Sequence, residues 1–194
     1  MPLRWSLVRR LLGALGVVAA MTAPAARATE MIHLDTKTLV QGSADIVVGK
    51  VESITPHWNS AHTKIFTDVS VRVTETLKGR GGDPLVLTQI GGEVDGVRYT
   101  VPGCPAFVRD EEALLFVWRD RLGRAQVNGL GQGKFDIRRD PATGEATVQR
   151  AVPGLAVSDP RLLRLVPQGQ AIPRIPLNDL LREIRRELGT GGGR

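Results

Sequence analysis

The sequence feature that most constrains the fold is a strict alternation of apolar and polar residues in the first half of the chain. Within 65–77, Val69, Val71 and Val73 alternate with polar residues. Because successive side chains of a strand point to opposite faces, this stretch has one apolar side and one solvent-facing side. It predicts a half-buried antiparallel strand rather than a helix.

Similar signals continue along the chain, separated by turn residues. Gly49 interrupts an apolar stretch and predicts a bulge or a close approach of neighbouring backbone, while Asp95-Gly96 predicts a tight hairpin. The continuous apolar run 113–118 suits a central strand that is covered on both faces. Strands are predicted over 46–54, 65–77, 85–90, 93–94, 97–101, 113–118, 125–130, 134–138 and 147–152.

A sheet of short, turn-linked strands must curl or pair with another sheet to bury its apolar face, so a small barrel and a sandwich both fit. The long first strands, one with a bulge, favour an antiparallel barrel over 29–152. A helical turn is predicted to begin at Thr36, and 153–176 to form a Pro/Gly-rich wrap or linker. The apolar stripe of 177–189 predicts an amphipathic helix that Asn178 caps and Gly189 ends, and 190–194 is predicted to be a disordered tail.

The first 28 residues have the three parts of a secretory signal peptide. A basic start is followed by the apolar stretch 11–21 and by Ala26-Arg27-Ala28, which predicts cleavage after Ala28. The apolar stretch is too short to span a membrane, so we expect an exported protein, periplasmic or extracellular, with no stable membrane span. Cleavage removes four arginines and no acid, which lowers the net charge from +6 to +2 and disfavours nucleic acid as a partner.

Candidate catalytic residues are few. Cys104 is the only thiol, and a small buried side chain beside Pro105 is the favoured interpretation over a nucleophile. His57 and His62 lie five residues apart near Asp68, but plain loop residues are favoured over metal ligands. The acids 110–112 are expected in an exposed turn. We therefore expect no enzyme activity, metal or cofactor.

The chain contains two short motifs, Ala44-Asp45-Ile46-Val47-Val48 and, about thirty residues later, Leu77-Lys78-Gly79. Together they resemble the opening of netrin-like domains, the family that includes the tissue inhibitors of metalloproteinases. Leu114-Leu115-Phe116 fits a later strand of that family. The resemblance covers about 44–118 and implies an OB-type barrel of five strands. The chain is also similar to uncharacterised exported bacterial proteins with a Gly91-Gly92…Gly96 hairpin and a 131–135 segment.

The resemblance implies protein binding, with inhibition of a secreted metalloprotease as one version. The animal inhibitors bind the protease zinc through an N-terminal cysteine, whereas the predicted mature chain starts at Thr29 and has no cysteine before Cys104. Inhibition would need other contacts. The leading hypothesis is an exported, non-enzymatic binding module. The alternatives are an envelope structural or assembly protein, and an enzyme that uses Cys104 or a His57/His62 metal site.

The predicted contact region combines the loop 56–64 with the hairpin at Asp95. Trp58 is the expected anchor, because an indole supplies a large rigid contact area and one hydrogen-bond donor. A Trp58 side chain folded back over the barrel end is the alternative. His57, His62 and Asp95 complete the predicted protein-binding site.

Overall fold

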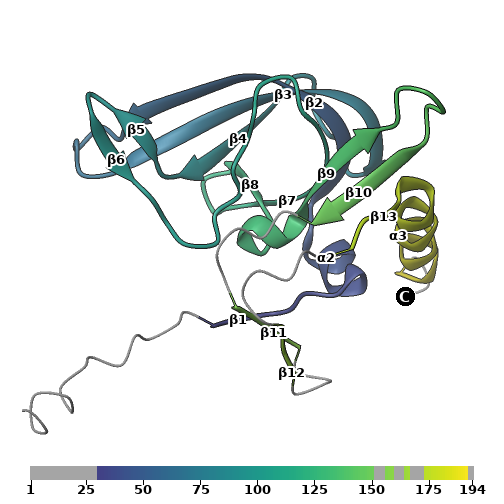
Figure 1. The fold of residues 1–194 in the computed structure, drawn as a ribbon. Coiled ribbons are helices and arrows are strands. Elements are labelled where there is room, and N and C mark those ends of the chain that lie inside the picture. The colour runs from purple at the N-terminus through teal and green to yellow at the C-terminus, as the bar shows by residue number, and fades with distance from the viewer. Residues whose placement is uncertain (1–29, 151–155, 160–163, 167–172, 192–194) are drawn as a thin grey trace, which may run out of the picture.

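The computed structural model describes residues 30–150, 156–159, 164–166 and 173–191 (Figure 1). The predicted signal peptide 1–28 lies outside the described residues. So do parts of the predicted wrap 153–176 and the last three residues of the predicted tail. Neither helix longer than one turn in the described part combines the length and apolar character needed to cross a membrane.

Five strands close into a barrel, as the sequence predicts. Their order around the barrel is β2-β3-β4-β8-β7, and β7 pairs back onto β2. All pairs are antiparallel except β4 with β8. This arrangement confirms the small OB-like barrel. The strands are β2 (Asp45–Trp58), β3 (Ile65–Lys78), β4 (Leu85–Ile90), β7 (Glu112–Arg119) and β8 (Ala125–Val127).

The long strands β2 and β3 can bend around the barrel because bulges interrupt their pairing. The β2–β3 register shifts at three points, one of them between Val48 and Gly49. A Cβ atom at Gly49 would lie 2.6 Å from the carbonyl oxygen of Arg72, so only glycine allows this approach. The prediction for Gly49 is confirmed.

A second layer covers the outside of β2 and β7. Strands β9 (Lys134–Arg139), β10 (Ala146–Arg150) and β13 (Ile175–Pro176) extend the sheet from β7. Helices α2 (Thr36–Gly42) and α3 (Leu177–Gly191) pack on this extension (Figure 1). Strand β7 is buried on both faces, because Leu115 and its alternates fill the barrel while Leu114 and Phe116 face the helices. This explains the continuous apolar run 113–118.

Both helices differ from the prediction at their ends. The cap of α2 is Asp35, one residue before the predicted Thr36, because its carboxylate accepts a hydrogen bond of 2.9 Å from the backbone N–H of Thr38. Asn178 lies inside α3. This helix also runs past Gly189, and the hydroxyl of Thr190 donates to carbonyl oxygens of the preceding turn.

The remaining elements are short. Strands β5 (Gly92–Val94) and β6 (Val97–Tyr99) form a hairpin, and a 3-10 helix, η2 (Leu130–Gly133), separates β8 from β9. Strand β1 (Glu30–Ile32) pairs in parallel with β11 (Ala156–Asp159), which pairs with β12 (Arg164–Val166). The segment predicted as a wrap therefore contains strands in its described parts.

Candidate functional site

The predicted contact region lies at one end of the barrel, where the β5–β6 hairpin meets the ends of β2 and β3 (Figure 1). The N–H of Gly91 donates to the carbonyl of Ile65 at 2.9 Å, and the hydroxyl of Thr67 donates to the carbonyl of Gly91 at 2.7 Å. A Cβ at Gly92 would lie 2.5 Å from Thr67 Oγ1. The hairpin backbone is therefore held directly against the barrel rim. We call this region, residues 57–64 with 92–99, the barrel end.

The hairpin turn is the one that the sequence predicts. Asp95 and Gly96 both have positive φ, 52° and 75°, which is the conformation of a two-residue type I′ turn. Across the hairpin, Arg98 and Glu93 form an ion pair of 2.6 Å. The apolar side chains of Val97 and Tyr99 are 49% and 39% exposed. The hairpin thus presents apolar surface next to a fixed turn.

Trp58 links the hairpin to the β2–β3 connection. Its indole Nε1 donates to Asp95 Oδ2 at 3.4 Å, and its ring stacks on His62 with centroids 5.9 Å apart. The loop between them is ordered by Asn59, whose Oδ1 accepts from the N–H groups of Thr63 and Lys64 at 2.8 and 3.0 Å. The structure therefore brings together three of the predicted site residues, Trp58, His62 and Asp95.

His57 has different partners from the other predicted residues. It lies within β2, as Trp58 does, although the sequence analysis places both in a loop. Its Nε2 lies 3.2 Å from Asp68 Oδ2, and its Nδ1 lies 3.1 Å from the carbonyl oxygen of Trp58. The Asp68 carboxylate also accepts from the hydroxyl of Thr88 at 2.8 Å. His57 is thus fixed against β3 and β4, while His62 contacts Trp58.

The described residues support neither a metal site nor a reactive thiol at Cys104. Within the described ranges, no cluster of three or more His, Cys, Asp or Glu residues is suited to hold a metal ion. Burial raises the pKa of the Cys104 thiol, which disfavours the reactive thiolate. Cys104 is therefore held in the form that is the poorer nucleophile.

The three acids 110–112 each pair with a different cation. Asp110 pairs with Lys50 at 2.9 Å, and Glu112 with Arg139 at 2.8 Å. Glu111 pairs at 2.9 Å with Lys134, whose side chain is buried over the ring of Phe107. The predicted exposed turn is wrong for Glu111 and Glu112, because Glu112 begins β7 and the two side chains are only 19% and 24% exposed. A buried ammonium needs a nearby carboxylate, and the sequence gives no sign that Lys134 is buried.

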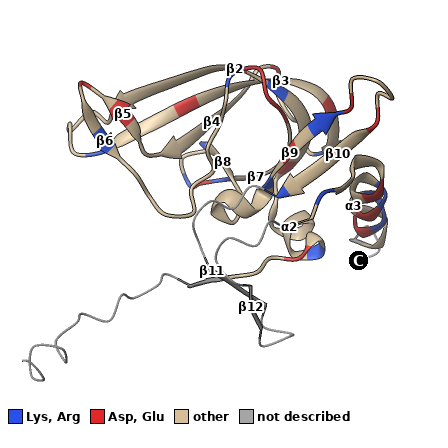
Figure 2. Ribbon diagram, viewed as in Figure 1, with Lys and Arg blue, Asp and Glu red and all other residues tan. Residues whose placement is uncertain are grey.

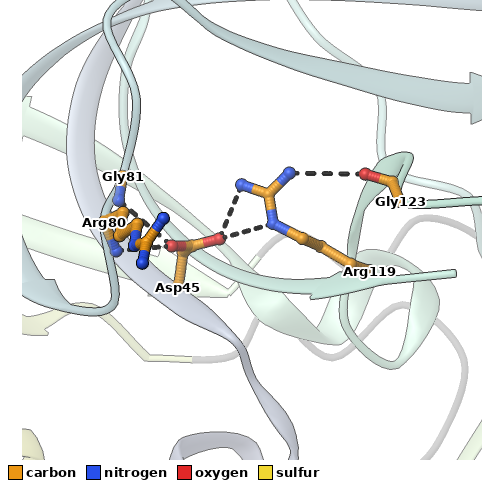
Figure 3. Close-up of polar contacts among 5 residues, drawn as sticks. All are labelled: Asp45, Arg80, Gly81, Arg119 and Gly123. Atoms are coloured by element: carbon orange, nitrogen blue, oxygen red, sulfur yellow. Dashed lines mark hydrogen bonds and ion pairs between the residues drawn. The ribbon is translucent and has the colours of Figure 1, made fainter.

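Asp45, whose role the sequence does not reveal, lies between the Arg80-Gly81 backbone and the side chain of Arg119 (Figure 3). Its buried carboxylate accepts from the backbone N–H groups of Arg80 and Gly81 at 2.9 and 3.1 Å. The other oxygen accepts from Arg119 Nε and Nη2 at 3.1 and 2.8 Å. Arg119 also donates to the carbonyl of Gly123 at 3.4 Å. We call these residues the Asp45 clamp; it joins the start of β2, the turn after β3 and the end of β7.

The clamp brings the two motifs of the resemblance into contact in this chain. The turn that follows Lys78 is folded around Asp45, and a Cβ at Gly79 would lie 2.3 Å from Asp45 Oδ1. Lys78 Nζ donates to the carbonyls of Val40 and Ser43, both at 2.7 Å. In this chain, Asp45 and Lys78-Gly79 therefore help to hold the barrel together.

The segment before α2 is anchored by a buried amide that the sequence does not reveal. Gln132 Oε1 accepts from the N–H of Leu34 at 2.8 Å, and its Nε2 donates to the carbonyl of Ile32 at 2.9 Å. Arg150 donates to the carbonyl of Leu34 at 2.8 Å, and burial lowers its pKa to about 10. This segment is thus held on η2 and β10 without a disulfide.

Comparisons with protein-family models, curated proteins and solved structures give no match for this chain.

Proposed function

We propose that the chain is an exported, non-enzymatic binding module that engages a protein partner through its barrel end. The observation that carries this proposal is the contact between Trp58 and Asp95, which joins the β2–β3 connection to the β5–β6 hairpin. Two segments that are far apart in the sequence thereby form one surface. Tryptophan is enriched among the residues that dominate the binding energy near the centre of protein interfaces.

The side chains around Trp58 support a protein partner. Val97 and Tyr99 add exposed apolar area, and His62 stacks on the indole. Figure 2 shows Lys/Arg and Asp/Glu interspersed on the strands and on α3, rather than one sign gathered on one element. Binding to nucleic acid depends on a concentration of positive charge, so this distribution favours a protein.

A secreted metalloprotease is the first partner to test, because of the resemblance to netrin-like inhibitors. Those inhibitors hold their chelating N-terminus with disulfides. Here Gln132 and Arg150 hold residues 32–34 by hydrogen bonds, and no cysteine precedes Cys104. Inhibition would therefore act through the barrel end, by covering the protease cleft rather than by binding its zinc.

The test uses the mature chain, after N-terminal sequencing of the exported protein has checked cleavage after Ala28. Proteins of the producing cell's secretome are captured on it, and the captured partner is titrated against wild type and the Trp58→Ala variant. We expect Trp58→Ala to raise the Kd at least tenfold, about 1.4 kcal/mol. If the partner is a metalloprotease, wild type inhibits it and Trp58→Ala inhibits it less.

Ile175→Ala is the matched control, because Ile175 is also an exposed apolar residue but lies on β13, beside α3 (Figure 1). Its Kd should equal that of wild type. An unchanged Kd for Trp58→Ala would contradict the barrel end as the binding surface. Retention of an intact Met1 chain in the membrane fraction would contradict export as a free protein.

A further inference from the structure

The β5–β6 hairpin leaves one edge of β6 unpaired. Within the described ranges, β5 is the only strand that pairs with β6, and β5 itself lies against β2 and β3. Figure 1 shows the hairpin at the left end of the barrel, on the far side from α3. Every residue from 95 to 100 is exposed. The second edge of β6 is therefore open to solvent.

The backbone groups of Arg98 point to this open edge. The turn 95–96 has two residues, so the flanking residues Val94 and Val97 form a hydrogen-bonded pair. Pairs alternate along an antiparallel ladder, and the next pair, Glu93 with Arg98, is therefore not hydrogen-bonded. The N–H and C=O of Arg98 point away from β5. In the part of the chain that the structure describes, neither group has a hydrogen-bond partner.

Strand β6 lacks the features that usually protect an edge strand. Soluble proteins commonly protect such edges with a lysine, a proline, a bulge or a very short strand. Strand β13, at an edge of the large sheet, has two residues, and one of them is Pro176. Strand β6 has no proline or lysine, and its one charge, on Arg98, is paired with Glu93 at 2.6 Å. The edge of β6 is thus suited to pair with the extended backbone of another chain.

The apolar side chains of β6 indicate which sequence would fit. Residues that pair across a hairpin share a face, so Tyr99 lies on the face of Gly92, and Val97 on that of Val94. A Cβ at Gly92 would lie 2.5 Å from Thr67 Oγ1, so this face is turned toward the barrel. Val97 and Tyr99 are nevertheless 49% and 39% exposed. A strand added to β6 would place every second side chain beside them.

We propose that the barrel end binds its partner by strand addition. An extended segment of the partner, with apolar residues at alternate positions, pairs with the open edge of β6. Hydrogen bonds to the backbone of Arg98 hold the segment, and its apolar side chains pack beside Val97 and Tyr99. The contact of Trp58 with Asp95 keeps the hairpin in place for this pairing. This mode of binding rests on the proposed function and specifies the form in which the partner is bound.

The test uses linear dodecapeptides displayed on phage and selected on the immobilised mature chain. We expect enrichment of sequences in which apolar and polar residues alternate. The strongest binder, made as a synthetic peptide, is titrated calorimetrically against wild type, Arg98→Pro and Arg98→Ala. Arg98→Pro removes the N–H at the open edge and should raise the Kd roughly tenfold or more. Arg98→Ala is the matched control, because it removes the side chain but keeps the backbone, and should change the Kd less than about threefold.

Amide hydrogen exchange tests the same contact without a substitution, so the outcome does not depend on the folding of Arg98→Pro. In wild type saturated with the peptide, the N–H of Arg98 should exchange roughly tenfold more slowly or less, because it then donates to the peptide. The exposed amide of Arg121, in the turn between β7 and β8, is the control and should be unaffected. Both rates are measured by NMR.

Strand addition is overturned if no peptide is enriched, if Arg98→Pro binds as wild type does, or if the exchange at Arg98 does not slow. Equal weakening in Arg98→Pro and Arg98→Ala also overturns it, because the side chain would then be responsible. The protein captured from the secretome separates this failure from that of the proposed function. A Kd that rises in Trp58→Ala but not in Arg98→Pro retains the barrel end and overturns strand addition. A Kd unchanged in Trp58→Ala contradicts the barrel end itself.

Discussion

The Asp45 clamp and the barrel end use similar side chains for different purposes. At the clamp, one buried carboxylate accepts four hydrogen bonds of 3.1 Å or less from the turn after β3 and from β7. At the barrel end, a single contact of 3.4 Å joins Trp58 to an exposed Asp95. Burial makes the first contact costly to break, whereas solvent can replace the second. The difference indicates that the clamp provides stability, while the contact at the barrel end contributes little to it.

The strongest test of this comparison is Asp45→Ala. It leaves two backbone N–H groups and the Arg119 guanidinium without their acceptor, so we expect a loss of about 3–5 kcal/mol in the free energy of unfolding. Urea denaturation of the mature chain measures it. Asp95→Ala is the control and should cost less than about 0.5 kcal/mol. Equal losses at Asp45 and Asp95 would contradict the distinction between the two regions.

A second test asks whether α3 is packed on the sheet as firmly as the residues of the Asp45 clamp are held together. Ile184 on α3 is fully buried, and Leu181 beside it is nearly so. Ile184→Asp and Leu181→Asp should each cost about 2–4 kcal/mol, because each places a carboxylate in an apolar layer. Thermal denaturation measures this loss. An unchanged Tm would mean that α3 is not docked in solution.

A third test concerns the barrel end alone. Trp58→Ala removes one long hydrogen bond and one stacking contact, both near the surface. We expect the Tm to change by no more than about 2 °C, less than a loss of 1 kcal/mol produces in a domain of this size. Differential scanning calorimetry measures it beside the partner titration described above. A collapse of the Tm with binding retained would place Trp58 in the core.

The smallest expected effect is at Cys104. This residue is partly buried, so its exposure is intermediate between that of the buried Asp45 and that of the exposed Asp95. Burial raises its pKa, so the thiolate forms only at a higher pH than in an exposed cysteine. The rate of labelling with iodoacetamide should therefore rise at more alkaline pH than the rate for free cysteine measured in parallel. Coincident pH profiles would show that the thiol is exposed.

Much of the fold follows from local patterns. The alternation in 65–77 predicts β3, and Asp95-Gly96 predicts the type I′ hairpin, because each depends on neighbours within a few residues. Helix ends are less well predicted. Asp35 and Thr36 are both good caps, and the choice between them depends on how Leu39 and Val40 reach the core.

The candidate site is only partly accessible to sequence reasoning. The sequence places Trp58, His62 and Asp95 in the same region because loops at one end of a barrel lie close together, and their contacts agree with that expectation. It does not separate His57 from them. Adjacent residues of a strand face opposite sides, and the sequence does not show that β2 continues through His57 and Trp58.

The sequence by itself determined the strand pattern, the bulge at Gly49 and the apolar stripe of α3, since these depend on residue types at short, regular spacing. Only the tertiary structure decided that Asp45 meets the turn after Lys78, that Lys134 is buried, and that Trp118 lies opposite Gln126 in the β7–β8 ladder. Each of these depends on barrel closure, which brings together residues that are far apart in the chain. Burial then determines whether a polar side chain stabilises the fold or remains available to a ligand.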